Sequence, residues 1–204
     1  MALGAAGYEV HRKKVLRSNG RQVLFKNTNL TQGLKKIHYG CGTHLMADWL
    51  NVDLHANKAD GFATVEFDLA TRHPFPDNWF NFGFCEDFLE HLTQVDSIKF
   101  LSEVYRTLAP GGVVRFSFPG LEGVLKIFYT QINFEAILKS SHEAYDRWAH
   151  HHLYARDELS LVCRHLGFTE INFVEYGKSK YKELRNLDTR ILQTGFNTYV
   201  ELTK

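Results

Sequence analysis

The segment KIHYGCG, residues 36–42, decides the fold of this chain. Its first four residues predict a short β-strand, and the strand leads directly into a Gly-Cys-Gly turn. Glycines in that position permit a tight turn and let the backbone approach a ligand closely. The segment therefore predicts a first strand that leads into a ligand-binding loop.

Further strand-like and helix-like segments follow this first strand. Strands are expected at residues 50–54, 63–68, 80–85, 113–118, 169–176 and 197–202, and helices at 97–109 and 158–165. Asp96 or Ser97 is expected to cap the first helix, the Pro-Gly-Gly of residues 110–112 to end it, and Gly167 to end the second. Strands that alternate with helices predict parallel βαβ units. We therefore expect an α/β fold, a three-layer sandwich with a mostly parallel seven-stranded sheet and one antiparallel edge strand.

The length of 204 residues predicts a single domain over residues 1–204. Residues 1–33 precede the first strand and form an N-terminal extension. Residues 121–157 are rich in aromatic residues and histidines, and an insertion above the carboxyl edge of the strands is where a substrate lid would lie. No apolar run is long enough for a membrane span. Three widely spaced cysteines favour a reducing, cytoplasmic location over a disulfide framework.

Charge is distributed unevenly along the chain. Residues 10–47 carry eight bases and no acid, whereas residues 53–103 carry ten acids and three bases. The basic segment fits either a solvated helix face or contact with an anion. It does not by itself indicate nucleic-acid binding, which we do not expect. The acidic segment suits a cationic ligand.

The loop at Gly40 and the acid at Asp53 together indicate a nucleoside ligand. An acid at the end of the second strand can accept hydrogen bonds from two ribose hydroxyls. The dinucleotide fingerprint has a third glycine and an acid about 20 residues further on. Here His44 follows the turn, and Asp53 comes only eleven residues after Gly42. The loop therefore suits a nucleoside without phosphates.

Four acids are expected at the ends of successive strands, which would place them at one edge of the sheet. They are Asp53, Asp68, Glu86 and Asp87. Carboxylates gathered in one crevice repel each other unless something positive lies among them. S-adenosylmethionine carries a sulfonium and an ammonium and no phosphate, so it fits such a crevice.

With these features the chain resembles the class I, Rossmann-like S-adenosylmethionine-dependent methyltransferases. More narrowly, it is similar to small predicted methyltransferases linked to bacterial surface glycans. The matching segments are IHYGCG (37–42), WLNVDL (49–54), EFDLA (66–70), HPFPDNWFNFGFCEDFLEHL (73–92), FLSEVYRTLAPGGVVRFSFPGLE (100–122), YARDELSLVCRHLGF (154–168), LRNLDTR (184–190) and TYVELTK (198–204). They imply a single-domain methyltransferase that uses S-adenosylmethionine.

The resemblance also implies which residues hold the cofactor. The cofactor site would comprise Tyr39, Gly40, Cys41, Gly42, Asp53, Leu54, Asp68, Leu69 and Glu86. The turn at residues 40–42 would lie under the methionine part, Asp53 would hold the ribose, Asp68 and Leu69 would flank the adenine, and Glu86 would stand near the methyl donor. The family often has an acid at the position of His38, so the usual contact to the cofactor's ammonium is altered here.

Methyl transfer from a sulfonium to a hydroxyl needs a base that removes the proton of the hydroxyl. His91 is the first candidate, because it follows the fourth strand near the donor end of the crevice. His142 or one residue of the 150–152 histidine run could also enter the site from the lid. Three adjacent histidines cannot all face one point on a helix, so no metal site is expected. Cys41 is expected to be a small packing residue.

The resulting prediction is methyl transfer to a small-molecule or glycan acceptor, most naturally at a hydroxyl. Aromatic residues of the insertion, Phe128, Tyr129, Tyr145 and Trp148, would either stack on a sugar or belong to the core. A non-catalytic cofactor-binding or regulatory protein with a methyltransferase fold is the alternative, motivated by His38 and His44. A nicotinamide-dependent oxidoreductase is disfavoured by the missing glycine. The sequence does not determine the oligomeric state.

Overall fold

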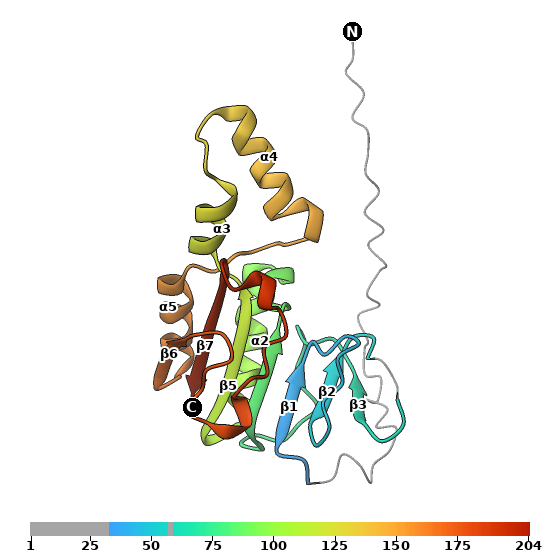
Figure 1. Cartoon of the computed structure of the whole chain (residues 1–204). Helices are drawn as coiled ribbons and strands as arrows, with labels where there is room; N and C mark the ends of the chain where they lie inside the picture. The colour runs from blue at the N-terminus through green and yellow to red at the C-terminus, as the bar shows by residue number, and fades with distance from the viewer. Residues whose placement is uncertain (1–32, 57–58) are drawn as a thin grey trace.

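The computed structural model describes residues 33–56 and 59–204. The predicted N-terminal extension, apart from Gly33, lies outside the described residues. Seven strands form one sheet in the order β3-β2-β1-β4-β5-β7-β6. Their bounds are β1 Lys36–Tyr39, β2 Leu50–Asp53, β3 Ala63–Glu66, β4 Phe80–Glu86, β5 Leu108–Pro119, β6 Glu170–Val174 and β7 Asn197–Thr203. The predicted α/β fold with a seven-stranded sheet is confirmed (Figure 1).

The strands from β3 to β5 pair in parallel, as the βαβ pattern predicts. The one strand of opposite direction is β7, which pairs antiparallel with both β5 and β6. It lies one place in from the edge, and β6 is the outer strand. The sheet is thus mostly parallel, and the antiparallel strand β7 lies beside the outer strand β6.

Helices α2 (Gln94–Thr107) and α5 (Arg156–Leu166) cover one face of this sheet. Thr93 caps α2, because its hydroxyl accepts the amide N–H of Asp96. The cap therefore lies three residues before Asp96 and four before Ser97, the two predicted caps. Gly167 ends α5 with φ of +106°, as predicted. Between these helices and the sheet lies the main core, with fully buried Phe100 and Phe116.

The end of α2 differs from the prediction. The helix stops at Thr107, and β5 begins at once with Leu108, which pairs with Phe80. Residues 110–112 therefore lie inside the strand, not at the helix end. Gly112 is required there because a Cβ would stand 2.8 Å from the carbonyl oxygen of Ala109 and 2.9 Å from that of Phe80.

The opposite face of β5 and β7 is covered by residues 175–196, which contain two short 3-10 turns, η3 (Lys182–Leu184) and η4 (Ile191–Gln193). The guanidinium of Arg115 on β5 fastens this segment, although the side chain is fully buried. Asp188 accepts hydrogen bonds from Nε at 2.9 Å and from Nη2, and Glu201 accepts one from Nη1 at 3.1 Å. The carbonyls of Glu175 and Lys178 accept the remaining N–H groups, so all five donors are satisfied.

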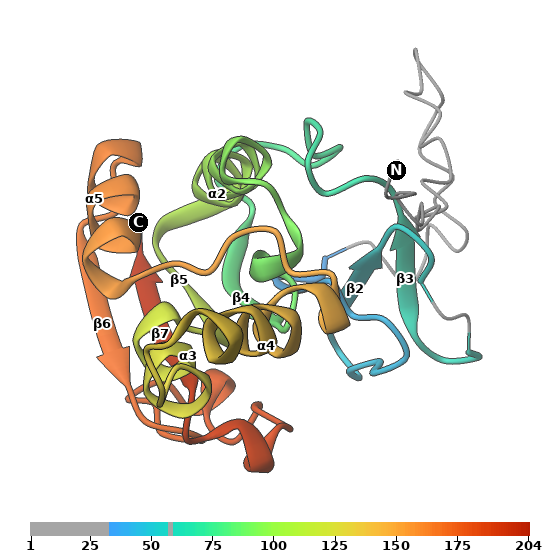
Figure 2. The ribbon, with the colours of Figure 1, turned by 90° about the horizontal axis from the view of Figure 1, so that it is seen from above.

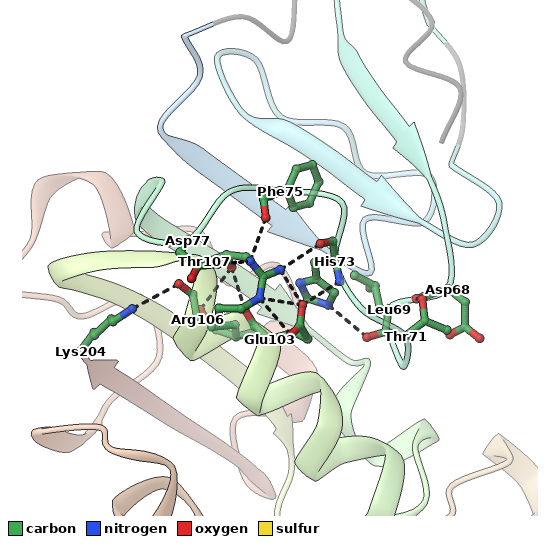
Figure 3. A network of polar contacts seen from close by, with 11 residues as sticks. Asp68, Leu69, Thr71, His73, Phe75, Asp77, Glu103, Arg106, Thr107 and Lys204 are labelled. Carbon is green, nitrogen blue, oxygen red and sulfur yellow. Dashed lines mark hydrogen bonds and ion pairs between the residues drawn. The ribbon is translucent and has the colours of Figure 1, made fainter. Parts of the chain in front are cut away.

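A second arginine fixes the loop between β3 and β4 to α2 (Figure 3). Arg106 donates to Glu103 on its own helix, to the carboxylate of Asp77, and to the carbonyl oxygens of His73 and Phe75. The loop has no helix among its described residues. These hydrogen bonds therefore hold it against α2, where a doubly wound sheet commonly has a connecting helix.

Helices α3 (Leu121–Phe128) and α4 (Phe134–Ala144), with the 3-10 turn η2 (Asp146–Trp148), make up most of the predicted insertion. They rise above the end of the sheet at which β1 and β2 end (Figure 1), and the view from above places them over the strand ends (Figure 2). Phe128, Tyr129 and Tyr145 pack in a small cluster of their own. Trp148 is 57% exposed, the most exposed of the four aromatic residues, and the Arg147 guanidinium lies 5.3 Å from its ring centroid.

No helix among the described residues combines the length and apolar character that crossing a bilayer requires. The three cysteines are free and buried.

Candidate active site

The parallel register brings the predicted site residues to one edge of the sheet. Tyr39 at the end of β1 pairs with Val52 on β2 and with Cys85 on β4. Gly40, Asp53 and Glu86 each come one residue further along the chain, at the ends of β1, β2 and β4. These three residues therefore lie at the same height at this end of the sheet. Asp68 follows β3, the neighbour of β2, by two residues. The strand ends place these residues as the sequence predicts, along one carboxyl edge.

The glycine turn is held by Asp53. One carboxylate oxygen accepts the amide N–H of Gly42 at 2.9 Å, and the other accepts that of His55 at 3.1 Å. In a phosphate-binding loop such an amide would point toward the ligand's phosphate. Because Gly42 donates to Asp53 instead, the turn fits a ligand without phosphates.

The two glycines of the turn are needed for different reasons. Both have positive φ, +64° at Gly40 and +49° at Gly42. A Cβ on Gly40 would lie 2.9 Å from the side chain of Phe88, whereas a Cβ on Gly42 would meet nothing within 4 Å. Gly40 is thus required by packing. The space beside Gly42 is open, which fits the methionine part of S-adenosylmethionine.

The other residues of the predicted cofactor site differ in how far their side chains are buried. The ring of Tyr39 is fully buried against Phe100, so only its main chain faces the edge. Cys41 is also buried, and burial raises the pKa of its thiol to about 12, which keeps it protonated. It is a packing residue and not a nucleophile. Leu69 is buried, whereas Leu54 is exposed.

Asp68 and Glu86 already have protein partners. The Asp68 carboxylate accepts the amide N–H of Ala70 at 2.9 Å. Glu86 is buried, and it accepts the backbone N–H of Thr189 at 2.8 Å together with the Thr189 hydroxyl. The segment that carries Thr189 therefore lies against the end of β4, and Glu86 is only 9% exposed.

His38 stands where the family often has an acid, but it cannot perform the role of that acid. Its ring is buried beside Asn51 and Phe84, with Nδ1 3.4 Å from the Asn51 side-chain oxygen. Burial lowers the pKa of His38 to about 4, so the ring is neutral at pH 7. It offers no negative charge to an ammonium group.

His91 lies in the 3-10 turn η1 (Leu89–His91), which follows β4. Its Nδ1 is 3.3 Å from the carbonyl oxygen of Ala149 in the insertion. Since a carbonyl only accepts, Nδ1 carries the proton and Nε2 has a free lone pair. Burial lowers the pKa of His91 below its ordinary value. The neutral ring can therefore act as a proton acceptor at pH 7.

The other candidate histidines lie in different surroundings in the structure. His142 is exposed on α4, with Nδ1 3.6 Å from the Asp146 carboxylate. His152 lies 3.1 Å from Glu158 on α5. His150 lies against His91, with ring centroids 5.1 Å apart in an edge-to-face arrangement. Burial and, as a lesser cause, the nearby His151 lower the pKa of His91. The histidine run thus brings His150 into direct ring contact with His91.

Sequence reasoning missed the residues that cover the end of β4. Thr189 holds Glu86, and Arg190 forms an ion pair with Asp87 at 3.1 Å. The only signal was the segment LRNLDTR, which carried a resemblance but no assigned role. Glu90 was passed over as well; burial, with Asp87 as a second cause, raises its pKa to about 8.

Two hollows lie away from this edge. One, of about 250 Å³, lies between α3 and α4 beside Phe128 and Lys139. The other, of about 480 Å³, lies beside Val174 at the end of β6 and is lined by Lys178–Lys180. Neither is lined by the glycine turn or by Asp53. The site at the strand edge is formed by backbone and carboxylate groups.

The comparisons with known proteins agree with this geometry. A family model described as a methyltransferase domain matches residues 37–116. A search of curated proteins found no relative. Among solved structures, the chain is similar to an S-adenosylmethionine-dependent methyltransferase from Mesorhizobium loti, with 18% identity, a TM-score of 0.56, and coverage of 84% of this chain and 91% of that one.

Two further solved structures share the fold. A SAM-dependent methyltransferase from Archaeoglobus fulgidus has 13% identity and a TM-score of 0.53, with coverage of 84% and 87%. Phosphoethanolamine N-methyltransferase 2 from Haemonchus contortus, in complex with S-adenosyl-L-methionine, has 14% identity and a TM-score of 0.51, with coverage of 82% and 47%. Residues 37–116 thus match a methyltransferase domain, and the solved structures show that the chain shares the fold of S-adenosylmethionine-dependent methyltransferases.

Proposed function

We propose that this enzyme transfers the methyl group of S-adenosylmethionine to a hydroxyl of a small-molecule or glycan acceptor. The observation that carries the proposal is His91: a neutral imidazole, with its Nε2 lone pair free, directly after the carboxyl end of β4 and in contact with the insertion. A carboxylate acceptor would need no such base, whereas a hydroxyl must lose its proton.

The residues that would hold the cofactor lie along the strand edge. The backbone of residues 39–42 would lie under the methionine part, and Asp53 and Leu54 would face the ribose. The Asp53 carboxylate accepts one hydrogen bond from the amide N–H of Gly42 and one from that of His55. A carboxylate has about four acceptor positions, so capacity remains for the ribose hydroxyls. Asp68 and Leu69 would flank the adenine, and Glu86 would complete the methionine end.

The cofactor supplies an activated methyl group on a sulfonium, so the protein's task is alignment and proton removal. His91 Nε2 would take the acceptor's proton as the oxygen attacks. Its Nδ1–H, held by the carbonyl oxygen of Ala149, fixes the ring orientation and the tautomer. Since Ala149 belongs to the insertion, the position of the base depends on how residues 121–157 lie over the strand edge.

We infer that residues 121–157 act as a lid within a single domain that spans residues 1–204. The insertion lies over the carboxyl ends of the strands, where ligands of such sheets bind. The exposed ring of Trp148 offers a stacking surface for a sugar. The segments LRNLDTR and TYVELTK support the narrower resemblance to enzymes of surface glycans. The three free cysteines support a cytoplasmic location.

The experiment is a search for a 14-dalton gain in metabolite and glycan extracts incubated with the purified enzyme and S-adenosylmethionine. Once an acceptor is found, His91→Gln should lower turnover about a hundredfold or more, a typical loss for a general base, with cofactor affinity unchanged. His142→Gln, which changes an exposed histidine on α4 that pairs with Asp146, is the matched control. Full activity of His91→Gln, or an acceptor methylated at a carboxylate, would contradict the proposal.

A further inference from the structure

A cluster of three potential metal ligands lies where the insertion meets the end of β4. Glu90 and His91 belong to η1, and His150 follows η2. One ligand atom from each residue lies within 4.8 Å of the other two. The cluster is held from both sides, because the backbone carbonyl of Glu90 accepts the amide N–H groups of His151 and His152 at 2.8 and 3.2 Å.

Both histidines present the same nitrogen to the cluster. Nδ1 of His91 donates to the carbonyl oxygen of Ala149, and Nδ1 of His150 donates to that of Ala144 at 2.8 Å. In each ring Nε2 therefore has the free lone pair. Metal-binding histidines almost always donate their other N–H to a carboxylate or a backbone carbonyl in this way, which fixes the ring for coordination.

The third member of the cluster, Glu90, is buried, and its carboxyl group lacks a full set of hydrogen-bond partners. Its side chain is 1% exposed, and one oxygen lies 3.9 Å from His91 Nε2. Among the described residues, the other oxygen, Oε2, has no hydrogen-bond partner. Burying a polar oxygen without a partner is costly, and buried carboxylates are commonly paired or coordinated to a metal. The unpartnered oxygen is thus a second observation, independent of the ligand spacing, that points to a ligand at this place.

We propose that Glu90, His91 and His150 bind one divalent ion of a first-row transition metal, with zinc as the reference ion. Two imidazole nitrogens and one carboxylate oxygen are the set found in open zinc and iron(II) sites, which keep a position for an oxygen ligand. Zinc bonds of about 2.0–2.2 Å place tetrahedral ligands about 3.4 Å apart. Nε2 of His91 and the Glu90 oxygen are 3.9 Å apart, so a shift of about 0.5 Å brings these two ligands to that spacing.

This site departs from the expectation that the sequence held no metal ligands. That expectation considered only the three adjacent histidines, whereas the structure recruits His150 alone and adds two ligands from η1. The ion would fasten the insertion to the end of β4. The ion would also bind the lone pair of His91 Nε2. While the ion is bound, His91 cannot accept a proton at that nitrogen.

The test is direct metal binding, independent of any acceptor. Chelator-treated enzyme is titrated with Zn²⁺ in competition with a chromophoric chelator, and with Co²⁺ while its visible absorption is recorded. We expect one ion per chain, and Co²⁺ bands of a low-symmetry site with nitrogen and oxygen ligands. Glu90→Gln and His150→Gln should each weaken binding about tenfold or more, because loss of even an outer partner of a ligand costs that much.

His142→Gln, which changes an exposed histidine outside the cluster, should bind as tightly as the wild type. Circular dichroism establishes that each variant is folded, and His150→Gln decides the matter if the buried Glu90→Gln change prevents folding. Two results would overturn the proposal: no stoichiometric binding by the wild type, or equal affinity in the wild type and His150→Gln.

Discussion

The buried pair of Arg115 and Asp188 gives the sharpest test of how the fold supports the site. Both side chains are fully inaccessible, and Asp188 accepts two hydrogen bonds from the guanidinium and one from the backbone N–H of Gly177. The change Asp188→Asn keeps the shape but removes the charge. It also turns an amide NH₂ toward guanidinium donors.

The magnitude follows from the burial of both partners. Removing one member of a buried ion pair costs about 3–5 kcal/mol, since the remaining charge stays buried without compensation. Glu201 remains at 3.1 Å from Arg115, which favours the lower half of that range. For a chain of this size 1 kcal/mol corresponds to about 2–4 °C in Tm. We therefore expect Tm to fall by about 6–15 °C.

The assay is thermal unfolding followed by circular dichroism, repeated with urea to obtain the free energy of unfolding. Glu170→Gln, which removes a solvent-exposed ion pair with Lys180, is the control and should leave Tm unchanged. Because Thr189 is the neighbour of Asp188 and holds Glu86, Asp188→Asn should also weaken binding of S-adenosylhomocysteine. A Tm within 2 °C of the wild type, which corresponds to about 1 kcal/mol or less, would refute the reasoning.

Three further predictions concern the strand edge. Asp53→Asn should weaken binding of S-adenosylhomocysteine in calorimetry by about 1.5–3 kcal/mol, because the ribose hydroxyls lose a charged acceptor; unchanged affinity would exclude Asp53 from the site. Gly40→Ala should destabilise the fold by about 1–3 kcal/mol in urea unfolding, since the new Cβ meets Phe88 and φ is positive; wild-type stability would show that the turn relaxes. The pKa of His38 is about 4 in the fold against 6.5 in the unfolded chain, so the unfolded chain takes up the proton first as pH falls. Wild type should then lose about 2–3 kcal/mol more than His38→Gln between pH 7 and 4.5, and equal losses in the two proteins would place His38 outside the core.

The sequence determined the sheet and its chemical edge. Short strands between turns and helices are encoded by local pattern, so the fold class could be predicted before any coordinates. The carboxyl edge could be predicted as well, because parallel strands that follow one another end on the same side. Gly40, Asp53 and Glu86 are level for that reason, and their strand-end positions are visible in the chain itself.

Only the tertiary structure decided what each of these groups faces. The antiparallel strand β7 lies between β5 and β6, a choice made by long-range pairing. Thr189 reaches Glu86 across more than a hundred residues of chain, and His150 reaches His91 through the fold of the insertion. Such contacts depend on packing between segments that no local pattern relates. The sequence therefore fixes which residues stand at the edge, and the packing of the insertion and of residues 175–196 fixes their partners and protonation.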